Sequence, residues 1–354
     1  MTYRVIQWST GNVGRYALRG IINHPDLELV GVWAHSKDKA GVDAGDIAGT
    51  APTGVKITND ADELLALNAD AVSYNSTGDL RPVEAIDDIV RLLGSGKNVV
   101  STSLVPLVYP PSAPEQMRDP LEEACLKNNV SCFTSGIDPG VANDLLPLVL
   151  TGLCERIDSV RVMEILDYAT YDQPEVLFHT MGFAHPLDHT PILLVPGVLS
   201  LAWGCVVHVI AAGLGVKLDD VREVVVEKVA APETFEVPSG TVEKGTMAGL
   251  RFEIQGIVAG EPRIIVEHVT RLRPDIAPHW PAPPGKGGYR VRIDGSPSIN
   301  VSLELEGDGG DENSGGLIVT AMRLLNSIPA VVEAPAGLLS ALDIPFTTGR
   351  GLMR

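Results

Sequence analysis

The chain has 354 residues, 45% of them hydrophobic and 20% charged, which predicts two folded domains and excludes a disordered chain. Lysine and arginine number 27 against 45 aspartates and glutamates, so the formal net charge is −18. Because no excess of cations is present to displace counterions from phosphates, this charge argues against nucleic acid as a partner. An anionic ligand would have to be held by local geometry.

The cysteines and the first residues indicate a reducing compartment. Cys125, Cys132, Cys154 and Cys205 form no CxxC pair, so they predict neither a zinc ribbon nor a disulfide scaffold. Residues 1–5 show no basic segment followed by an apolar run, and we therefore expect a cytoplasmic protein without a secretory signal.

The first third of the chain alternates short apolar runs with helical stretches, which predicts a parallel sheet with helices on both faces. The expected strands are residues 3–8, 27–34, 55–58, 71–74, 98–102 and 130–134. The expected helices are residues 11–22, 61–69, 82–94 and 114–128.

After about Pro147 the pattern changes to long stretches in which apolar and polar residues alternate, as in half-buried antiparallel strands. These stretches are residues 159–167, 221–230, 249–259, 263–272, 289–294 and 298–306. We therefore predict a dinucleotide-binding domain over residues 1–147, with residues 330–354 docking back on it. A substrate and dimerisation domain, of α+β type with an open and mostly antiparallel sheet, is predicted over residues 148–329.

Three further segments in the second half of the chain have distinctive compositions. Residues 190–216 carry no Asp, Glu, Lys or Arg, but prolines and glycines interrupt them, so we expect a buried helix over residues 196–214 and no membrane partner. The acidic, glycine-rich residues 307–316 lack the ligand spacing of a calcium loop and predict a solvated turn. Residues 317–326 predict a helix.

The most informative motif follows the first expected strand and opens the first helix. Compared with G-x-G-x-x-G, a serine takes the first glycine position, while Gly11 and Gly14 hold the second and third. The amino end of a helix offers free N–H groups and partial positive charge, which suits a pyrophosphate. This motif predicts a Rossmann-type fold, with the cofactor bound by Ser9, Thr10, Gly11, Asn12, Val13 and Gly14.

The end of the second strand bears on the choice of cofactor. An NAD enzyme usually has an acidic residue there to bind the ribose 2′-hydroxyl, but this strand ends in Ala34 and His35. Ser36 and Lys37, or Lys39, can instead bind a 2′-phosphate, so we expect NADP. Asp38 keeps NAD open as the alternative.

Ligands in open α/β sheets bind beyond the carboxyl ends of the strands. The fourth and fifth strands end in small polar residues, which suit close backbone approach and bonds to a ribose. The residues expected to contact the cofactor there are Asn75, Thr77 and Thr102.

Several further motifs run along the whole chain: S-T-G-N-V-G-R from Ser9, G-I-D-P-G from Gly136, M-G-F from Met181, T-A-M-R-x-x-N-x-I-P from Thr320 and T-T-G-R from Thr347. Together these motifs resemble the dihydrodipicolinate-reductase-like family, and within it the 2,4-diaminopentanoate dehydrogenases and native amine dehydrogenases. The resemblance covers nearly the whole chain. It implies an NAD(P)-dependent oxidoreductase, commonly a homodimer, whose substrate domain closes over the nicotinamide.

The sequence departs from this family after the fifth strand. The amine-forming members have a glutamate there, in a motif like S-T-x-E-E-L-x-Y-P, whereas residues 101–110 are one residue longer and contain no carboxylate. A general acid or base must lie within hydrogen-bond reach of the proton that it moves, which puts amination by ammonia in doubt. The nicotinamide chemistry is unaffected, because the cofactor supplies the hydride.

Other side chains can take over the proton transfer. Glu164, Asp167, Tyr168 and Tyr171 lie at the end of the first strand of the second domain, and we expect Tyr168 to donate to a carbonyl oxygen and His185 to supply a proton near pH 7. His185 and His189 have metal-ligand spacing, but Pro186 lies between them and no third ligand is evident, so no metal is expected. The predicted substrate-binding residues are Leu104, Val105, Asp138, Asn143, Phe183, Thr320 and Asn326.

The sequence therefore predicts an NADP-preferring oxidoreductase that acts on a small carbonyl, imine or amine in a cleft between two domains. Two alternatives stay open. One is a nucleotide-binding sensor that has lost catalysis, which the missing carboxylate favours. The other is a dihydrodipicolinate reductase-type enzyme, which would need a basic pocket for a dicarboxylate.

Overall fold

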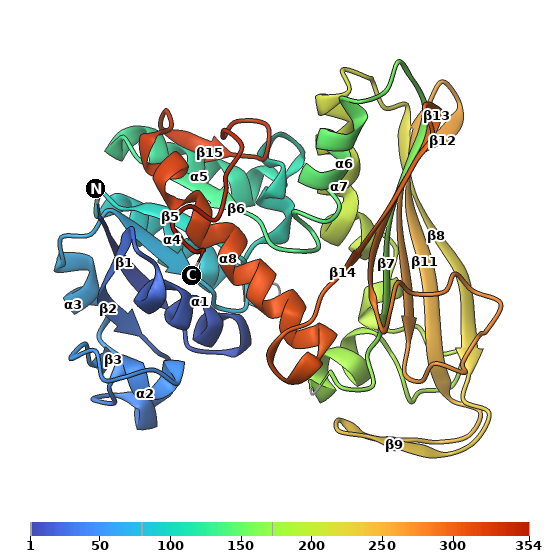
Figure 1. Cartoon of the computed structure of the whole chain (residues 1–354), viewed down its shortest axis with the longest axis horizontal. Coiled ribbons are helices and arrows are strands. Elements are labelled where there is room, and N and C mark those ends of the chain that lie inside the picture. Colours follow the sequence, from blue (N-terminus) through green and yellow to red (C-terminus); the bar gives the residue numbers. More distant parts are fainter. Residues whose placement is uncertain (1, 79–80, 172, 354) are drawn as a thin grey trace. The chain divides into compact units, whose positions relative to one another are not determined.

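The structure is a computed structural model, and it describes residues 2–78, 81–171 and 173–353. The chain divides into two compact units, which are described separately. Unit 1 comprises Met1–Ile137 and Leu317–Arg354, and unit 2 comprises Asp138–Gly316. Together they confirm the predicted α/β class, with a parallel sheet in unit 1 and a mixed sheet in unit 2 (Figure 1).

Unit 1 is built on a seven-stranded parallel sheet with the order β15-β6-β5-β4-β1-β2-β3. Its strands are β1 (Tyr3–Trp8), β2 (Leu27–Trp33), β3 (Ile57–Thr58), β4 (Ala71–Tyr74), β5 (Asn98–Ser101), β6 (Ser131–Thr134) and β15 (Gly337–Leu339). The first six strands lie where the apolar runs predict them. Residues of β4, β5 and β6 are buried throughout, as expected for strands covered on both faces.

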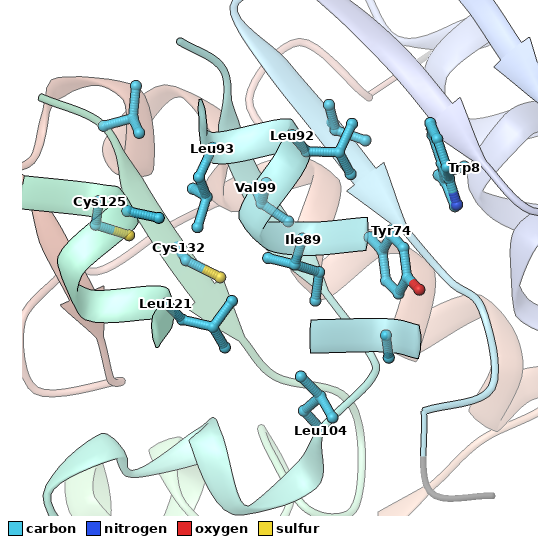
Figure 2. Packing of buried hydrophobic residues seen from close by; sticks show 14 of the residues in the cluster. Trp8, Tyr74, Ile89, Leu92, Leu93, Val99, Leu104, Leu121, Cys125 and Cys132 are labelled. Carbon is cyan, nitrogen blue, oxygen red and sulfur yellow. The ribbon is translucent and has the colours of Figure 1, made fainter. Parts of the chain in front are cut away.

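The helices of unit 1 pack into several apolar clusters, and the two largest of those described contain alternate residues of β1, Ile6 in one and Val5 in the other. The helices are α1 (Asn12–Asn23), α2 (Ala44–Ala48), α3 (Ala61–Ala66), α4 (Pro82–Gly94), α5 (Glu115–Asn128) and the greater part of α8 (Glu312–Glu333). Ile89 and Leu92 of α4 pack with Leu121 of α5 in one core (Figure 2). Ile21 of α1 packs with Leu325 of α8 in the other.

Unit 2 is built on a six-stranded sheet with the order β14-β13-β7-β12-β11-β8. Its strands are β7 (Arg156–Asp167), β8 (Asp220–Ala230), β11 (Met247–Val258), β12 (Glu261–Arg271), β13 (Gly288–Ser296) and β14 (Ile299–Glu304). Only the pairing of β7 with β12 is parallel among the described ladders, so the sheet is mostly antiparallel, as predicted. A separate two-stranded ladder joins β9 (Phe235–Val237) to β10 (Gly240–Val242).

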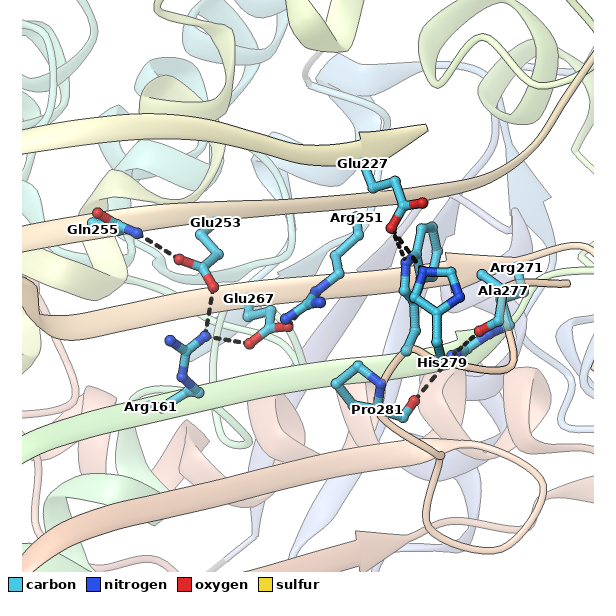
Figure 3. Close-up of polar contacts among 11 residues, drawn as sticks. Arg161, Glu227, Arg251, Glu253, Gln255, Glu267, Arg271, Ala277, His279 and Pro281 are labelled. Carbon is cyan, nitrogen blue, oxygen red and sulfur yellow. Dashed lines mark hydrogen bonds and ion pairs between the residues drawn. The ribbon is translucent and has the colours of Figure 1, made fainter. Parts of the chain in front are cut away.

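The two faces of the unit 2 sheet differ in chemistry. Helix α7 (Val198–Gly213) packs on β8, β11 and β12, and α6 (Leu145–Thr151) packs on β7 and β13. Trp203 of α7 contacts Phe252 and His268, so even-numbered residues of β11 and β12 face α7. The odd-numbered residues of the other face carry a network of ion pairs in which Glu267 lies between two arginines (Figure 3).

Helix α8 begins earlier than the sequence predicts. Residues 307–316 were expected to form a solvated turn, but the helix starts at Glu312, because the carboxylate of Asp311 accepts a hydrogen bond from the backbone N–H of Ser314 at 2.7 Å. That contact satisfies a free donor at the amino end of the helix and allows Gly315 and Gly316 to be helical.

Helix α8 also changes the division of the chain. The sequence placed the boundary at Pro147 and the return at residue 330, whereas the compact units divide after Ile137 and unit 1 resumes at Leu317. The physical reason is that Leu324, Leu325 and Ile328 are fully buried in the core of unit 1. Among the described helices, α8 is long and apolar enough to cross a membrane by length and composition, with 44% of the relevant window buried inside the protein.

Candidate active site

The phosphate loop follows β1 and is shaped by backbone contacts. Ser9, at the first glycine position of the motif, has φ of 80°, the left-handed conformation that glycine favours. The side-chain amide of the buried Gln7 donates to the Ser9 carbonyl at 2.8 Å and holds this turn. A Cβ on Gly14 would lie 2.3 Å from the same carbonyl oxygen, so only glycine lets the helix approach the strand here.

Gly11 has a different role from Gly14, because a Cβ on Gly11 would meet only the Ser9 hydroxyl oxygen, 3.9 Å away. Gly11 is the N-cap residue that directly precedes α1, and within the described residues no side chain caps this helix end. The first turn also contains no acidic residue. Free N–H groups with open space before them fit the pyrophosphate of a dinucleotide. Thr10 is buried behind the loop, whereas Asn12 is exposed and Val13 half-buried.

The structure joins two more of the predicted cofactor residues to this loop. The Asn75 side-chain oxygen accepts hydrogen bonds from Gln7 at 2.9 Å and from the hydroxyl of Ser73 at 3.0 Å. The Asn75 amide in turn lies 3.4 Å from the hydroxyl oxygen of Thr102. The ends of β1, β4 and β5 are therefore linked by side chains at one edge of the sheet. Thr77, the other predicted residue, is exposed.

The end of β2 places a cation against the phosphate loop. The ammonium group of Lys39 donates to the hydroxyl of Thr10 at 3.0 Å and lies 3.3 Å from the Thr10 carbonyl oxygen. Ser36 and Lys37 are exposed on the same short segment, as is Asp38. Lys39, which the sequence offered as an alternative to Lys37, is thus the lysine that the fold holds in place.

The segment after β5 differs from its predicted role. Leu104 was expected to line a substrate pocket, but its side chain is 1% exposed and belongs to the core with Ile89 and Leu121 (Figure 2). Its φ of 59° is left-handed, a conformation that the sequence does not predict. Val105 is half-buried at the start of a short 3-10 turn, η2 (Val105–Val108).

The two predicted substrate residues of α8 lie apart. The hydroxyl of Thr320 accepts a hydrogen bond from the backbone N–H of Ile137 at 3.2 Å, just beyond the carboxyl end of β6. Asn326 lies instead 3.2 Å from His24, in a depression lined by Tyr3 at the amino end of β1. The structure therefore separates Asn326 from the edge of the sheet that carries the phosphate loop.

Unit 2 contains a buried chain of polar side chains that joins three predicted residues. The hydroxyl of Tyr168 donates to Glu164 at 2.8 Å, and Glu164 lies 3.4 Å from Nδ1 of His268. On the other side of the ring, Nε2 of His268 lies 3.5 Å from Asp138. We call Asp138, His268 and Glu164 the buried triad. Asn143 donates to Asp138 at 2.6 Å.

The surroundings of the triad favour the protonated form of His268. The ring of Phe252 stacks on the imidazole at 4.9 Å, and Trp203 contacts it at 4.4 Å while its indole N–H donates to Asp138 at 2.8 Å. The side chains of Asp138 and His268 are only 2% and 4% exposed. Burial acts to lower the pKa of His268, but the charges of Asp138 and Glu164 outweigh it and raise that pKa.

The two carboxylates of the triad differ. Burial raises the pKa of Asp138 to about 6, against the opposing charge of His268. Burial also acts to raise the pKa of Glu164, but hydrogen bonds from His268, Tyr168 and Tyr289 hold it below its usual range. Burial and the nearby Glu164 keep the pKa of Tyr168 well above 10, so this hydroxyl remains protonated and able to donate.

The triad offers three ligand atoms within 4.8 Å of one another, which raises the question of a metal ion. The two carboxylates face opposite nitrogens of the same imidazole, Nδ1 and Nε2. One ion cannot bind both nitrogens of a ring, so this arrangement does not fit a single metal held by all three residues. It fits an imidazolium with a carboxylate at each N–H.

The remaining predicted residues of unit 2 lie in another segment. His185 is half-buried and stacks on His189 with ring centroids 4.5 Å apart, and Phe183 is fully buried. The structure thus connects Tyr168 to Asp138 and Asn143, but it does not connect His185 to this chain of hydrogen bonds among the described residues.

His268, the central member of the triad, is not among the residues that the sequence predicts for the site. His268 is directly paired with Glu164 across the parallel ladder of β12 and β7, and Tyr289 is paired with Glu164 on the other side. The only signal in the sequence is an isolated histidine at an inward-facing position of a predicted strand. Its partner depends on the register between strands about a hundred residues apart.

Comparison with known proteins identifies the family. A family model described as the 2,4-diaminopentanoate dehydrogenase C-terminal domain matches residues 141–353. An amine dehydrogenase of Streptomyces virginiae is 43% identical over 98% of this chain and 97% of its own length. The 2,4-diaminopentanoate dehydrogenase of Acetoanaerobium sticklandii is 25% identical over 74% of this chain and 70% of its own length.

The fold has a solved counterpart. The structure of an amine dehydrogenase from Mycobacterium smegmatis superposes with a TM-score of 0.77 at 18% identity, covering 98% of this chain and 97% of the other. The resemblance inferred from the sequence motifs is confirmed. The chain belongs to the amine dehydrogenase and 2,4-diaminopentanoate dehydrogenase family, and it is an oxidoreductase that uses a nicotinamide cofactor.

Proposed function

We propose that this protein is an NADP-preferring amine dehydrogenase-like enzyme that reduces a small carbonyl or imine. Two observations, each made within one unit, support the proposal: unit 1 has a free helix end at Gly11, and unit 2 has a buried proton-donating chain that ends at Tyr168. The bound cofactor would supply the hydride. Unit 1 would hold its phosphates, and unit 2 would supply protons to the substrate.

The charge of the triad supports an imine or amine substrate over a dicarboxylate. The lowered pKa of Glu164 favours its ionised form and the raised pKa of His268 favours the imidazolium; with both carboxylates ionised, the triad carries one net negative charge. This charge favours an iminium or ammonium group and opposes the dianion that a dihydrodipicolinate reductase-type enzyme would bind. The triad also supplies the buried carboxylates that the segment after β5 lacks.

The activity can be tested with purified protein. NADPH oxidation would be followed with aliphatic ketones and aldehydes of three to eight carbons, with and without ammonium chloride. Turnover that requires ammonium would establish amine formation, and turnover without it would establish carbonyl reduction. If NADPH binds tightly but none of these compounds is reduced, the protein is the sensor and the proposal is wrong.

Lys39 tests the preference for NADP. Lys39→Ala is expected to weaken NADPH binding about tenfold or more, because it removes a charged hydrogen-bond donor from the 2′-phosphate, and to change NADH binding by about twofold at most. Fluorescence titration of both cofactors measures this difference. Lys127→Ala, at an exposed position of α5, is the control and should alter neither affinity. Tighter binding of NADH than NADPH by the native protein would contradict the preference.

We further propose that the protein is a cytoplasmic homodimer. Unit 2 exposes large apolar side chains over a short stretch of the chain, with Ile192 59%, Val195 44% and Leu201 48% exposed in a single chain. The described cysteines are all free, which suits a reducing compartment. Light scattering coupled to gel filtration measures the molar mass in solution. A mass equal to that of one chain would contradict the homodimer.

A further inference from the structure

The buried triad has a feature that its packing does not explain. Nε2 of His268 is buried and has no hydrogen-bond partner in the part of the chain that the structure describes. The Asp138 carboxylate oxygen that faces it is 3.5 Å away. Nδ1 is likewise 3.4 Å from Glu164, whereas Tyr168 donates to that carboxylate at 2.8 Å. The imidazole is therefore held between two acceptors without a short bond to either one.

The order of these groups forms one line across unit 2. Asp138 is fixed by Trp203 and Asn143 at one end, and Tyr168 is half-buried at the other. Between them, each proton-bearing atom faces an acceptor: the hydroxyl faces Glu164, Nδ1 faces Glu164, and Nε2 faces Asp138. Glu164 lies 2.8 Å from the Tyr168 hydroxyl and 3.4 Å from Nδ1 of His268, so its carboxylate can carry a proton between the imidazolium and the hydroxyl.

We propose that Asp138, His268 and Glu164 form a proton relay that resupplies the hydroxyl of Tyr168, from which the substrate takes its proton. The inference rests on the proposed function. In this step the substrate heteroatom takes the Tyr168 proton with the electron pair that hydride addition frees. Tyr168 regains a proton through Glu164 from Nδ1 of His268, which becomes neutral. After the product has left, solvent protonates Tyr168, and a proton passes back through Glu164 to His268, which restores the imidazolium for the next turnover.

Within the relay, Tyr168 is the catalytic residue and the three triad members are positioning residues. Asp138 keeps the proton on His268, and Glu164 passes it on. Other titratable groups lie close to the relay and must be considered in any pH profile. They are Tyr171, Tyr289, Cys205 of α7, Asp144 at the start of α6, and Glu267 on the opposite face of β12.

The test measures kcat against pH for the full chain, using NADPH and the ketone or aldehyde of the panel that turns over fastest. His268→Gln is expected to lower kcat about tenfold or more while NADPH affinity changes less than about twofold. The native profile should fall at high pH as His268 loses its proton, and this limb should be absent in His268→Gln. His208→Gln, on α7 and outside the relay, is the matched control.

Asp138→Asn provides a second test that does not depend on removing the imidazole. It takes away one of the charges that keep His268 protonated, so the high-pH limb should move to lower pH. A purely structural role would lower kcat at every pH without moving the limb. An unmoved limb, or a kcat for His268→Gln within about twofold of the native value, would overturn the relay. Absence of turnover by the native protein would instead reject the proposed function.

Discussion

Replacing Gly11 with aspartate is expected to weaken dinucleotide binding at least about a hundredfold, while the protein stays as stable as before. The side chain would project from the start of α1 into space that protein atoms leave open, since the nearest atom to its Cβ is 3.9 Å away. Aspartate is a favourable residue at a helix start, because its carboxylate accepts hydrogen bonds from the free N–H groups. The same carboxylate would fill the space in which the pyrophosphate binds, and its negative charge would repel the pyrophosphate.

Gly14→Ala is the matched comparison for stability, because its added Cβ strains the phosphate loop, whereas the Cβ of Gly11→Asp meets open space. Its Cβ would lie 2.3 Å from the Ser9 carbonyl oxygen, so the strand and helix must separate and the melting temperature should fall. Gly11→Asp should leave the melting temperature unchanged or raise it. Calorimetry for stability and fluorescence titration for binding separate the two variants. Native-like affinity in Gly11→Asp would show that the loop is not the phosphate site.

Loss of Glu267 is expected to lower the free energy of unfolding by about 3 kcal/mol. This side chain is 1% exposed, and it accepts hydrogen bonds from Arg251 at 2.8 Å and from Arg161 (Figure 3). Each arginine is only about one quarter exposed, with 23% and 27% of its side chain accessible. Glu267→Ala would leave Arg251 without this ion pair in a poorly hydrated position, while Arg161 keeps Glu253.

Urea unfolding of Glu267→Ala measures this loss. Glu261→Ala, at the exposed beginning of the same strand, is the control and should change the free energy of unfolding by less than about 0.5 kcal/mol. Glu267→Gln retains hydrogen-bonding capacity without the charge, so its loss in free energy of unfolding should lie between those of the other two variants. If Glu267→Ala costs less than about 1 kcal/mol, the network behaves like exposed ion pairs, and water must reach it.

The sequence predicts the sheet of unit 1 closely because each of its strands is a separate apolar run bounded by helical periodicity. The expected strand at residues 3–8 and helix at residues 82–94 coincide with β1 and α4. Local conformation was harder to foresee. Ser9 has a left-handed conformation at a glycine position of the motif. Leu104, which was predicted to line a substrate pocket, also has a left-handed conformation and lies in the core.

The candidate site was predicted in parts. The phosphate loop follows from its spacing alone. Tyr168 is predicted from its place at the end of a strand, and Asp138 and Asn143 from their places on either side of Pro139-Gly140, the expected hinge. Their connection was not, because it passes through His268. That residue meets Glu164 only when β12 lies parallel to β7 in the observed register, and this register is set by the whole sheet.

The return of the chain to unit 1 has a consequence for synthesis on the ribosome. Strand β15 pairs with β6, and Leu324 and Ile328 of α8 fill the same core as Tyr3 and Ile21. None of these contacts can form until the ribosome has synthesised residues that lie nearly two hundred positions after Ile137. Unit 2 is continuous in sequence and can close before them, so the nascent amino-terminal segment must keep apolar surface exposed while unit 2 is being made.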